Sequence, residues 1–160
     1  MARTYVAKVS GGVWSLHAKG LRNFVCLRYA LEFHGIAQKA GSPIIRAFLL
    51  GQALELYLKA FLFHNGYGEK QLKKKPFGHN LKRLLDEAVV KGLNTGIHIS
   101  PALRGDLEAL NKVYASKALQ YFSIVYIVAT PTLPNLARLF RFATMLKGYL
   151  AGLIREPPNQ

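Results

Sequence analysis

Residues 42–66, SPIIRAFLLGQALELYLKAFLFHNG, decide the fold. The segment opens with Ser42 and Pro43, a pair that favours a helix start because serine caps backbone amides and proline fits the first turn. Apolar side chains then fall on nearly every side of a 3.6-residue repeat, which is typical of the central helix of a bundle. Gly51 interrupts this pattern and predicts a close approach of another helix.

Four other segments show helical periodicity. One covers Ser15 to Gln38, before the central segment, and another covers Asn80–Lys91 and ends at Gly92. A further helix begins at the Ser100–Pro101 pair, and the last runs from about Thr132 to Ile154. Five helices joined by short to moderate loops predict an all-α protein, an up-and-down helical bundle.

We expect one domain in this chain of 160 residues. Residues 16–155 form the bundle, residues 1–15 a weakly structured arm that Gly11 and Gly12 interrupt, and residues 156–160 a tail. The segment Tyr121–Thr130 is rich in β-branched and aromatic residues, as strands are. No second strand is there to pair with it, so we interpret it as an extended connector or a distorted helix end.

The charge is strongly unbalanced, with 22 Lys and Arg against 8 Asp and Glu and a formal net charge of +14. This favours nucleic acid, anionic lipid or an acidic protein as partner, and a solubility bias is the alternative. Cys26 is the single cysteine, which excludes an internal disulfide and fits a reducing compartment. No signal peptide or bilayer-spanning segment is visible, so we expect a cytoplasmic protein without membrane contact.

Basic side chains crowd the start of the helix predicted from Asn80. The positive end of a helix dipole disfavours them by about 0.3–1 kcal/mol. Two interpretations stay open: a bound phosphate, held by ammonium groups and free backbone amides, or a solvated basic loop. The residues that we assign to anion or nucleic-acid binding are Lys73, Lys74, Lys75, Lys82 and Arg83.

A polar cluster is expected where the central helix meets the start of the next one. Glu55 and Lys59 are one helical turn apart, in the order that favours an ion pair. They form either a structural pair or a polar site in which Lys59 is available to a phosphate. His79 lies beside Asn80, a good N-cap, so both join the predicted cluster.

Other chemistry has little support in the sequence. The five histidines lack metal-ligand spacing, and no phosphate-binding glycine loop or nucleophile elbow is present. Eight carboxylates leave little material for a two-carboxylate site. We therefore expect no metal and no cofactor, and we interpret Cys26 as a core residue.

Two motifs and their order resemble the HEPN superfamily of small helical domains. The first, ALELYLKAFLFHNG at residues 53–66, contains the pattern Ala-x-Glu-x-x-Leu-Lys-Ala followed by glycine. The second, GHNLKRLLDEA at residues 78–88, contains Gly-His-Asx-Leu. The resemblance covers roughly residues 17–153, and Gln120–Tyr121 stands where an Arg-Tyr pair is common.

The resemblance implies a helical bundle, usually a homodimer. The superfamily includes ribonucleases, RNA-binding modules and companions of small nucleotidyltransferases in toxin–antitoxin pairs. Its nuclease members carry Arg-x4–6-His near the start of a late helix, whereas the match here, Arg28 to His34, lies in the first helix. Because these two residues are six positions apart on one helix, their side chains point away from each other. They are therefore weak catalytic candidates.

The sequence thus favours a non-catalytic domain that binds RNA or a nucleotide through a basic surface. One alternative is an interaction partner of a nucleotidyltransferase-type protein, in which the surplus charge matches an acidic surface. The other is a metal-independent ribonuclease, in which His34 or His79 takes part in cleavage.

Overall fold

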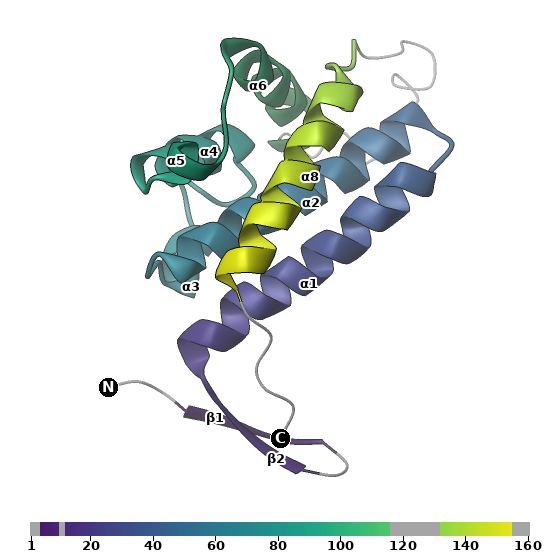
Figure 1. Cartoon of the computed structure of the whole chain (residues 1–160). Helices are drawn as coiled ribbons and strands as arrows, with labels where there is room; N and C mark the ends of the chain where they lie inside the picture. Colours follow the sequence, from purple (N-terminus) through teal and green to yellow (C-terminus); the bar gives the residue numbers. More distant parts are fainter. Residues whose placement is uncertain (1–3, 10–11, 116–131, 155–160) are drawn as a thin grey trace.

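The computed structural model of the chain places a helical bundle after a short β-hairpin (Figure 1). It describes residues 4–9, 12–115 and 132–154. Seven helices lie within these ranges: α1 Ala18–Lys39, α2 Pro43–His64, α3 Glu69–Lys73, α4 Leu81–Val90, α5 Leu93–Gly96, α6 Pro101–Ala115 and α8 Leu136–Leu153. The predicted all-α bundle is confirmed, with a hairpin added at its start.

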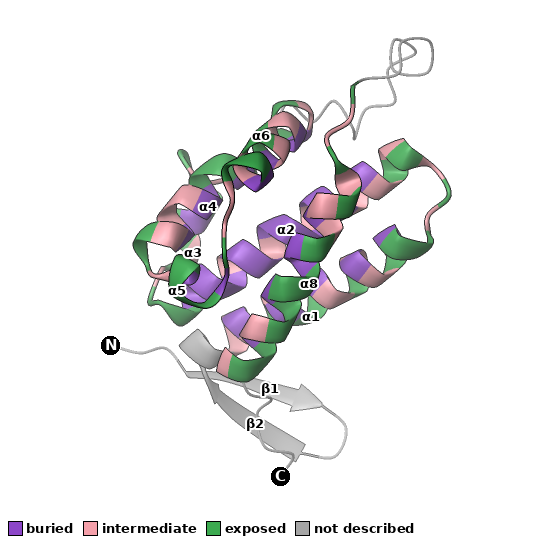
Figure 2. Ribbon diagram, turned by 45° about the horizontal axis from the view of Figure 1, so that its top comes forward, coloured by how far each residue is buried: buried purple, intermediate pink, exposed green. Residues whose placement is uncertain are grey.

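The central position of α2 organises the bundle. α2 packs against α1, α4, α6 and α8, and Figure 2 shows buried residues along its length. Its side chains without exposed surface include Leu50, Leu54, Tyr57, Leu58 and Leu62. Each large apolar side chain of this kind contributes about 1.5–3 kcal/mol when it is removed from water, so α2 supplies much of the core.

Side-chain caps set the starts of the long helices. Ser42 accepts from the Ile45 amide at 3.5 Å, and Ser100 from the Leu103 amide at 3.2 Å. The last helix begins later than predicted because Asn135, not a residue near Thr132, accepts the Arg138 amide at 3.0 Å. None of the helices in the described ranges has both the length and the apolar character that crossing a bilayer requires.

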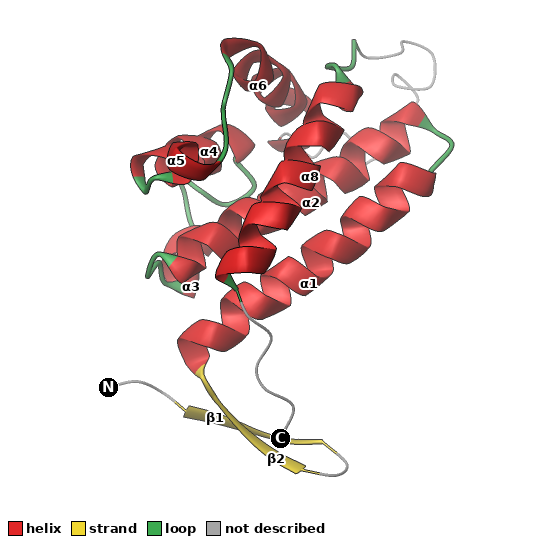
Figure 3. Ribbon diagram, in the orientation of Figure 1, coloured by secondary structure: helices red, strands yellow, loops and turns green. Residues whose placement is uncertain are grey.

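The N-terminal segment differs from the predicted arm. Strands β1 (Thr4–Val9) and β2 (Gly12–His17) pair antiparallel, with Thr4 opposite His17 and Val9 opposite Gly12. Figure 3 shows this hairpin at the start of α1, outside the bundle. The sequences TYVAKV and GVWSLH contain the β-branched and aromatic residues that favour strands, and α1 therefore begins at Ala18 rather than Ser15.

Two short helices were not predicted. α3 lies in the segment interpreted as a basic loop, where Leu72 is buried and Lys73 pairs with Glu69 at 2.5 Å. α5 follows Gly92, whose left-handed backbone, with φ of 91°, ends α4. The segment Tyr121–Thr130, predicted as a connector or helix end, lies outside the described residues.

Gly51 of α2 lies directly against the ring of Tyr114 of α6. A Cβ atom at this position would lie 2.6 Å from the Tyr114 ring, which confirms the close helix contact predicted there. Gly105, in contrast, lies in α6 with open space around it.

We expect Gly51→Ala to lower the free energy of unfolding by about 1–3 kcal/mol, because Tyr114 must move to admit the methyl group. The control, Gly105→Ala, should raise it by about 0.4–1 kcal/mol through the lower entropy of its unfolded chain. Denaturant unfolding measures both values. A stabilised Gly51→Ala variant would contradict the close packing.

Candidate functional site

The carboxylate of Glu55 gathers polar side chains from three parts of the bundle. Glu55 lies on α2 and is 4% exposed. Its Oε1 accepts from Lys59 Nζ at 2.5 Å, and its Oε2 accepts from the Tyr114 hydroxyl at 2.6 Å and lies 3.0 Å from His79 Nδ1. We call Glu55, Lys59, His79 and Tyr114 the Glu55 cluster.

Burial explains why so many donors converge on one carboxylate. The side chains of Glu55 and Lys59 are 5% and 12% exposed, so both charges have lost most of their water. A buried ion pair compensates for this only when its remaining hydrogen-bonding capacity is satisfied. Tyr114 and His79 meet this need by contacting Oε2 of Glu55. Both carboxylate oxygens of Glu55 therefore have partners within the cluster.

Tyr114 is the member that the sequence analysis missed. It lies on α6, is 4% exposed, and packs its ring against the bare backbone of Gly51. Burial, and then the charge of Glu55 and the hydrogen bond to it, raise the pKa of the Tyr114 hydroxyl. The phenol therefore keeps its proton and stays a donor to Glu55.

The backbone before α4 turns the imidazole of His79 toward Glu55. Gly78 has φ of 38°, in the left-handed region, and its amide donates to the Lys74 carbonyl at 3.1 Å. The His79 ring also meets the Tyr114 ring edge-on, at 6.4 Å between centroids. Because a carboxylate only accepts, Nδ1 of His79 carries a proton and Nε2 is the ring nitrogen left for a ligand.

His79 also borders a surface groove of about 460 Å³. The groove is lined by Lys73, by residues 75–80 and by Ala115. The side chain of His79 is 52% exposed, and Lys73 and Lys75 are exposed as well. One half-exposed imidazole and two exposed lysines thus line the groove, and the ammonium of Lys73 is also paired with Glu69 at 2.5 Å.

The other residues predicted to bind anions lie elsewhere. Lys74 is exposed and does not line the groove. Lys82 lies 3.9 Å from Asp86 and lines a different cavity. Arg83 is exposed, in the first turn of α4. The predicted basic patch therefore divides, with only Lys73 and Lys75 beside His79.

Backbone amides at the start of α4 are less available than the sequence suggested. Asn80 accepts from the Arg83 amide at 3.1 Å, as its predicted N-cap role requires. Asn111 of α6 accepts from the Leu81 amide at 2.7 Å. Since side chains already occupy these two donors, an anion in the groove would depend on Lys73, Lys75 and His79.

Arg28 and His34 do not form a shared site within the chain. His34 is 4% exposed and faces the core, whereas Arg28 is exposed on α1. Burial, and then the charge of Lys147, lower the pKa of His34. A neutral, buried imidazole on a different helix face from Arg28 cannot join it in cleaving a substrate bound to this chain.

Cys26 lies partly buried on α1, beside an apolar groove that Leu56 and Phe63 also line. Burial is the main cause that raises the pKa of its thiol to about 11. The thiolate is therefore scarce near neutral pH, which agrees with a packing role. In the described ranges, no three or more His, Cys, Asp and Glu residues form a group that could hold a metal ion.

Comparison of the chain with protein-family models, with curated proteins and with solved structures gave no match. The resemblance to the HEPN superfamily therefore stays a prediction carried by the two short motifs. The Glu55 cluster and the groove beside it define the site by geometry alone.

Replacing Glu55 should expose the energetic role of the cluster. We expect Glu55→Gln to lower the free energy of unfolding by about 3 kcal/mol, because it leaves Lys59 charged and poorly solvated. The double variant Glu55→Gln/Lys59→Met should recover at least half of this loss. Urea unfolding at neutral pH measures all three proteins.

Two outcomes would contradict this account. A single variant within about 0.5 kcal/mol of the natural protein would mean that the ion pair contributes little. A double variant no more stable than Glu55→Gln would mean that the unpaired Lys59 charge is not the cause of the loss.

Proposed function

We propose that the protein is a non-catalytic domain that binds RNA or a nucleotide by its phosphate groups in the groove beside His79. The observation that carries the proposal is the position of Lys73, Lys75 and His79 around one open groove of about 460 Å³. Ammonium groups attract phosphate, and a doubly protonated His79, held at Nδ1 by Glu55, offers it a directed hydrogen bond from Nε2–H.

The buried carboxylate supports this assignment through its effect on His79. With Nδ1 held at 3.0 Å from Glu55, the ring cannot rotate without losing that contact. A ligand at Nε2 therefore meets an imidazole of fixed orientation, which lowers the entropy lost on binding.

The whole-chain charge supports a polyanionic ligand. The net charge of +14 is far larger than the charge of the groove residues and favours the approach of nucleic acid. The groove would then fix one phosphate, and other basic residues would follow the strand. Binding of this kind weakens steeply as salt rises, because counterions are released from the nucleic acid.

A metal-independent ribonuclease is the second candidate. The pair of His79 and Glu55 favours it, since an exposed imidazole that donates to a carboxylate can act as a general base through Nε2. Cleavage also needs a group to protonate the leaving oxygen, and Lys73 and Lys75 are the other titratable side chains of the groove. In this case His79, rather than His34, would carry the reaction.

Binding of a labelled single-stranded RNA across a salt series tests the proposal. We expect Lys73→Gln/Lys75→Gln to weaken binding and to reduce the slope of log K against log salt by about 1–2. The control Lys39→Gln/Arg141→Gln removes the same charge from exposed positions at the end of α1 and on α8. It should change affinity much less.

Each other outcome points to a different function. An equal loss of RNA affinity in both double variants would mean that net charge alone explains the binding. It would contradict a site at the groove. Cleavage of the RNA, abolished by His79→Ala, would establish the ribonuclease instead. Absence of binding at low salt would overturn both and favour a protein partner, to which the exposed Val25, Tyr29 and Ile36 of α1 would offer an apolar contact.

A further inference from the structure

A second polar cavity lies between α1 and α8. It has a volume of about 130 Å³ and shares no residue with the Glu55 cluster. Its lining comes from α1 and α8 alone: Leu31, His34, Gly35, Gln38, Thr144 and Lys147. The function proposed above makes no use of it.

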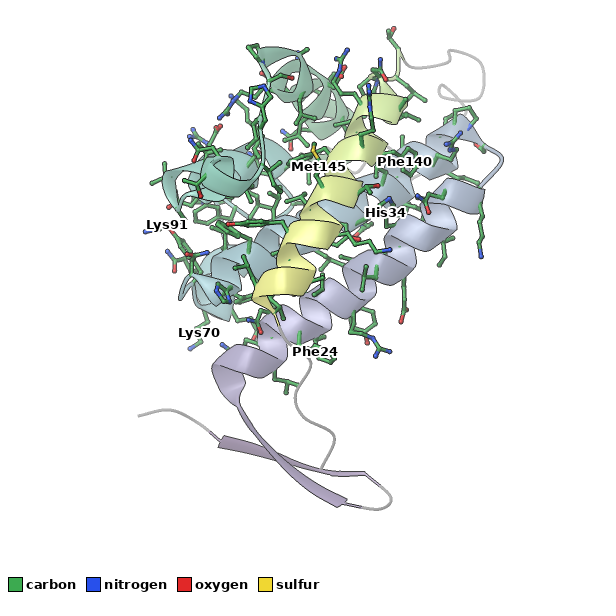
Figure 4. All side chains as sticks on the ribbon, in the orientation of Figure 1. Phe24, His34, Lys70, Lys91, Phe140 and Met145 are labelled. Atoms are coloured by element: carbon green, nitrogen blue, oxygen red, sulfur yellow. The ribbon has the colours of Figure 1, made fainter. Side chains whose placement is uncertain are left out.

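The imidazole of His34 is fixed by aromatic contacts at this cavity. It stacks on Phe140 of α8, at 5.9 Å between centroids and 29° between planes, and meets Tyr57 of α2 edge-on at 6.0 Å. Figure 4 shows His34 and Phe140 where α1 and α8 face each other. With 4% exposure, the ring has no room to reorient.

Hydrogen bonding defines which nitrogen of His34 carries the proton. The Tyr57 hydroxyl lies 3.2 Å from Nδ1, and burial raises the pKa of Tyr57, so the hydroxyl keeps its proton. We take the hydroxyl as the donor in this contact and Nδ1 as the acceptor. The neutral ring then carries its own proton on Nε2.

Nε2 of His34 is a buried donor without an acceptor. No described residue hydrogen-bonds to it, and the atom itself is closed to solvent. Buried polar groups nearly always have a hydrogen-bond partner, because a buried group without one has lost its bonds to water and gained none in return. Because the His34 ring lines the cavity, we infer that this donor serves a ligand or an ordered water once the neighbouring side chains give way.

The remaining polar groups of the cavity favour an anion. Lys147 brings a positive charge and Gln38 an amide that can donate, whereas the Thr144 hydroxyl donates to the Phe140 carbonyl at 3.0 Å. No carboxylate lines the cavity. The volume of about 130 Å³ exceeds the space that a single water needs.

We propose that the cavity between α1 and α8 binds a small oxyanion, a phosphate or carboxylate group, through His34 Nε2–H and the Lys147 ammonium. The buried donor orients one oxygen of the ligand, and the exposed lysine closes over the others. This site is independent of RNA binding at the His79 groove, and either can fail without the other.

The histidine side-chain resonances of the full chain, followed by ¹⁵N NMR, test this site directly. Inorganic phosphate and acetate are added in separate titrations at constant ionic strength, with chloride as control. We expect His34 to show the Nε2–H tautomer and a saturable shift with phosphate, acetate or both at about millimolar concentration. The two titrations distinguish a phosphate site from a carboxylate site.

Variants of exposed residues provide the controls. Lys147→Gln should weaken the response of His34 at least about tenfold, whereas Arg141→Gln, on the same helix but outside the cavity, should leave it unchanged. Lys73→Gln/Lys75→Gln should also leave it unchanged, which separates this site from the groove.

Three results would overturn the proposal. The first is a His34 protonated on Nδ1. The second is a shift that does not saturate with either anion, as expected if the cavity holds water only. The third is an equal response in the natural protein and in Lys147→Gln.

Discussion

The structure depends on one buried carboxylate, that of Glu55, in a helix that is otherwise apolar. An ionised group at this depth is tolerated only with close donors, and three side chains provide them from separate elements: Lys59 from α2 itself, Tyr114 from α6 and His79 from the start of α4. The need to solvate Glu55 therefore fixes how α4 and α6 meet the central helix.

This constraint also shapes the surface. His79 is held from behind by Glu55 and is half exposed in front, where Lys73 and Lys75 border the same groove. A core interaction thus gives a loop residue a defined orientation, which is what recognition of a phosphate requires. The oxyanion site that we propose between α1 and α8 follows the same principle, since Tyr57 and Phe140 contact His34.

Much of this could be read from the sequence, because it depends on local chemistry. The apolar period of 42–66, the caps at Ser42 and Asn80 and the helical spacing of Glu55 and Lys59 are each encoded within a few residues. Long-range geometry was not accessible: nothing in the sequence near Tyr114 shows that its hydroxyl reaches Glu55, and only Gly51 indicated a close neighbour.

Other differences have equally physical causes. The run of lysines divides because Lys82 lies within the helix, next to Asp86, whereas Lys73 and Lys75 lie before it. The hairpin and α3 escaped prediction because short elements carry too little periodicity to be separated from loops.

The most direct test of the central claim is a titration of the protein with a nucleoside monophosphate, followed at the side-chain nitrogens of His79 by ¹⁵N NMR. The account predicts that His79 in the complex carries a proton on both Nδ1 and Nε2 and that Nε2 shows a saturable shift, weakened when Glu55→Gln removes the charge behind the ring. A shift of the same size in Glu55→Gln, or none in either protein, would contradict it.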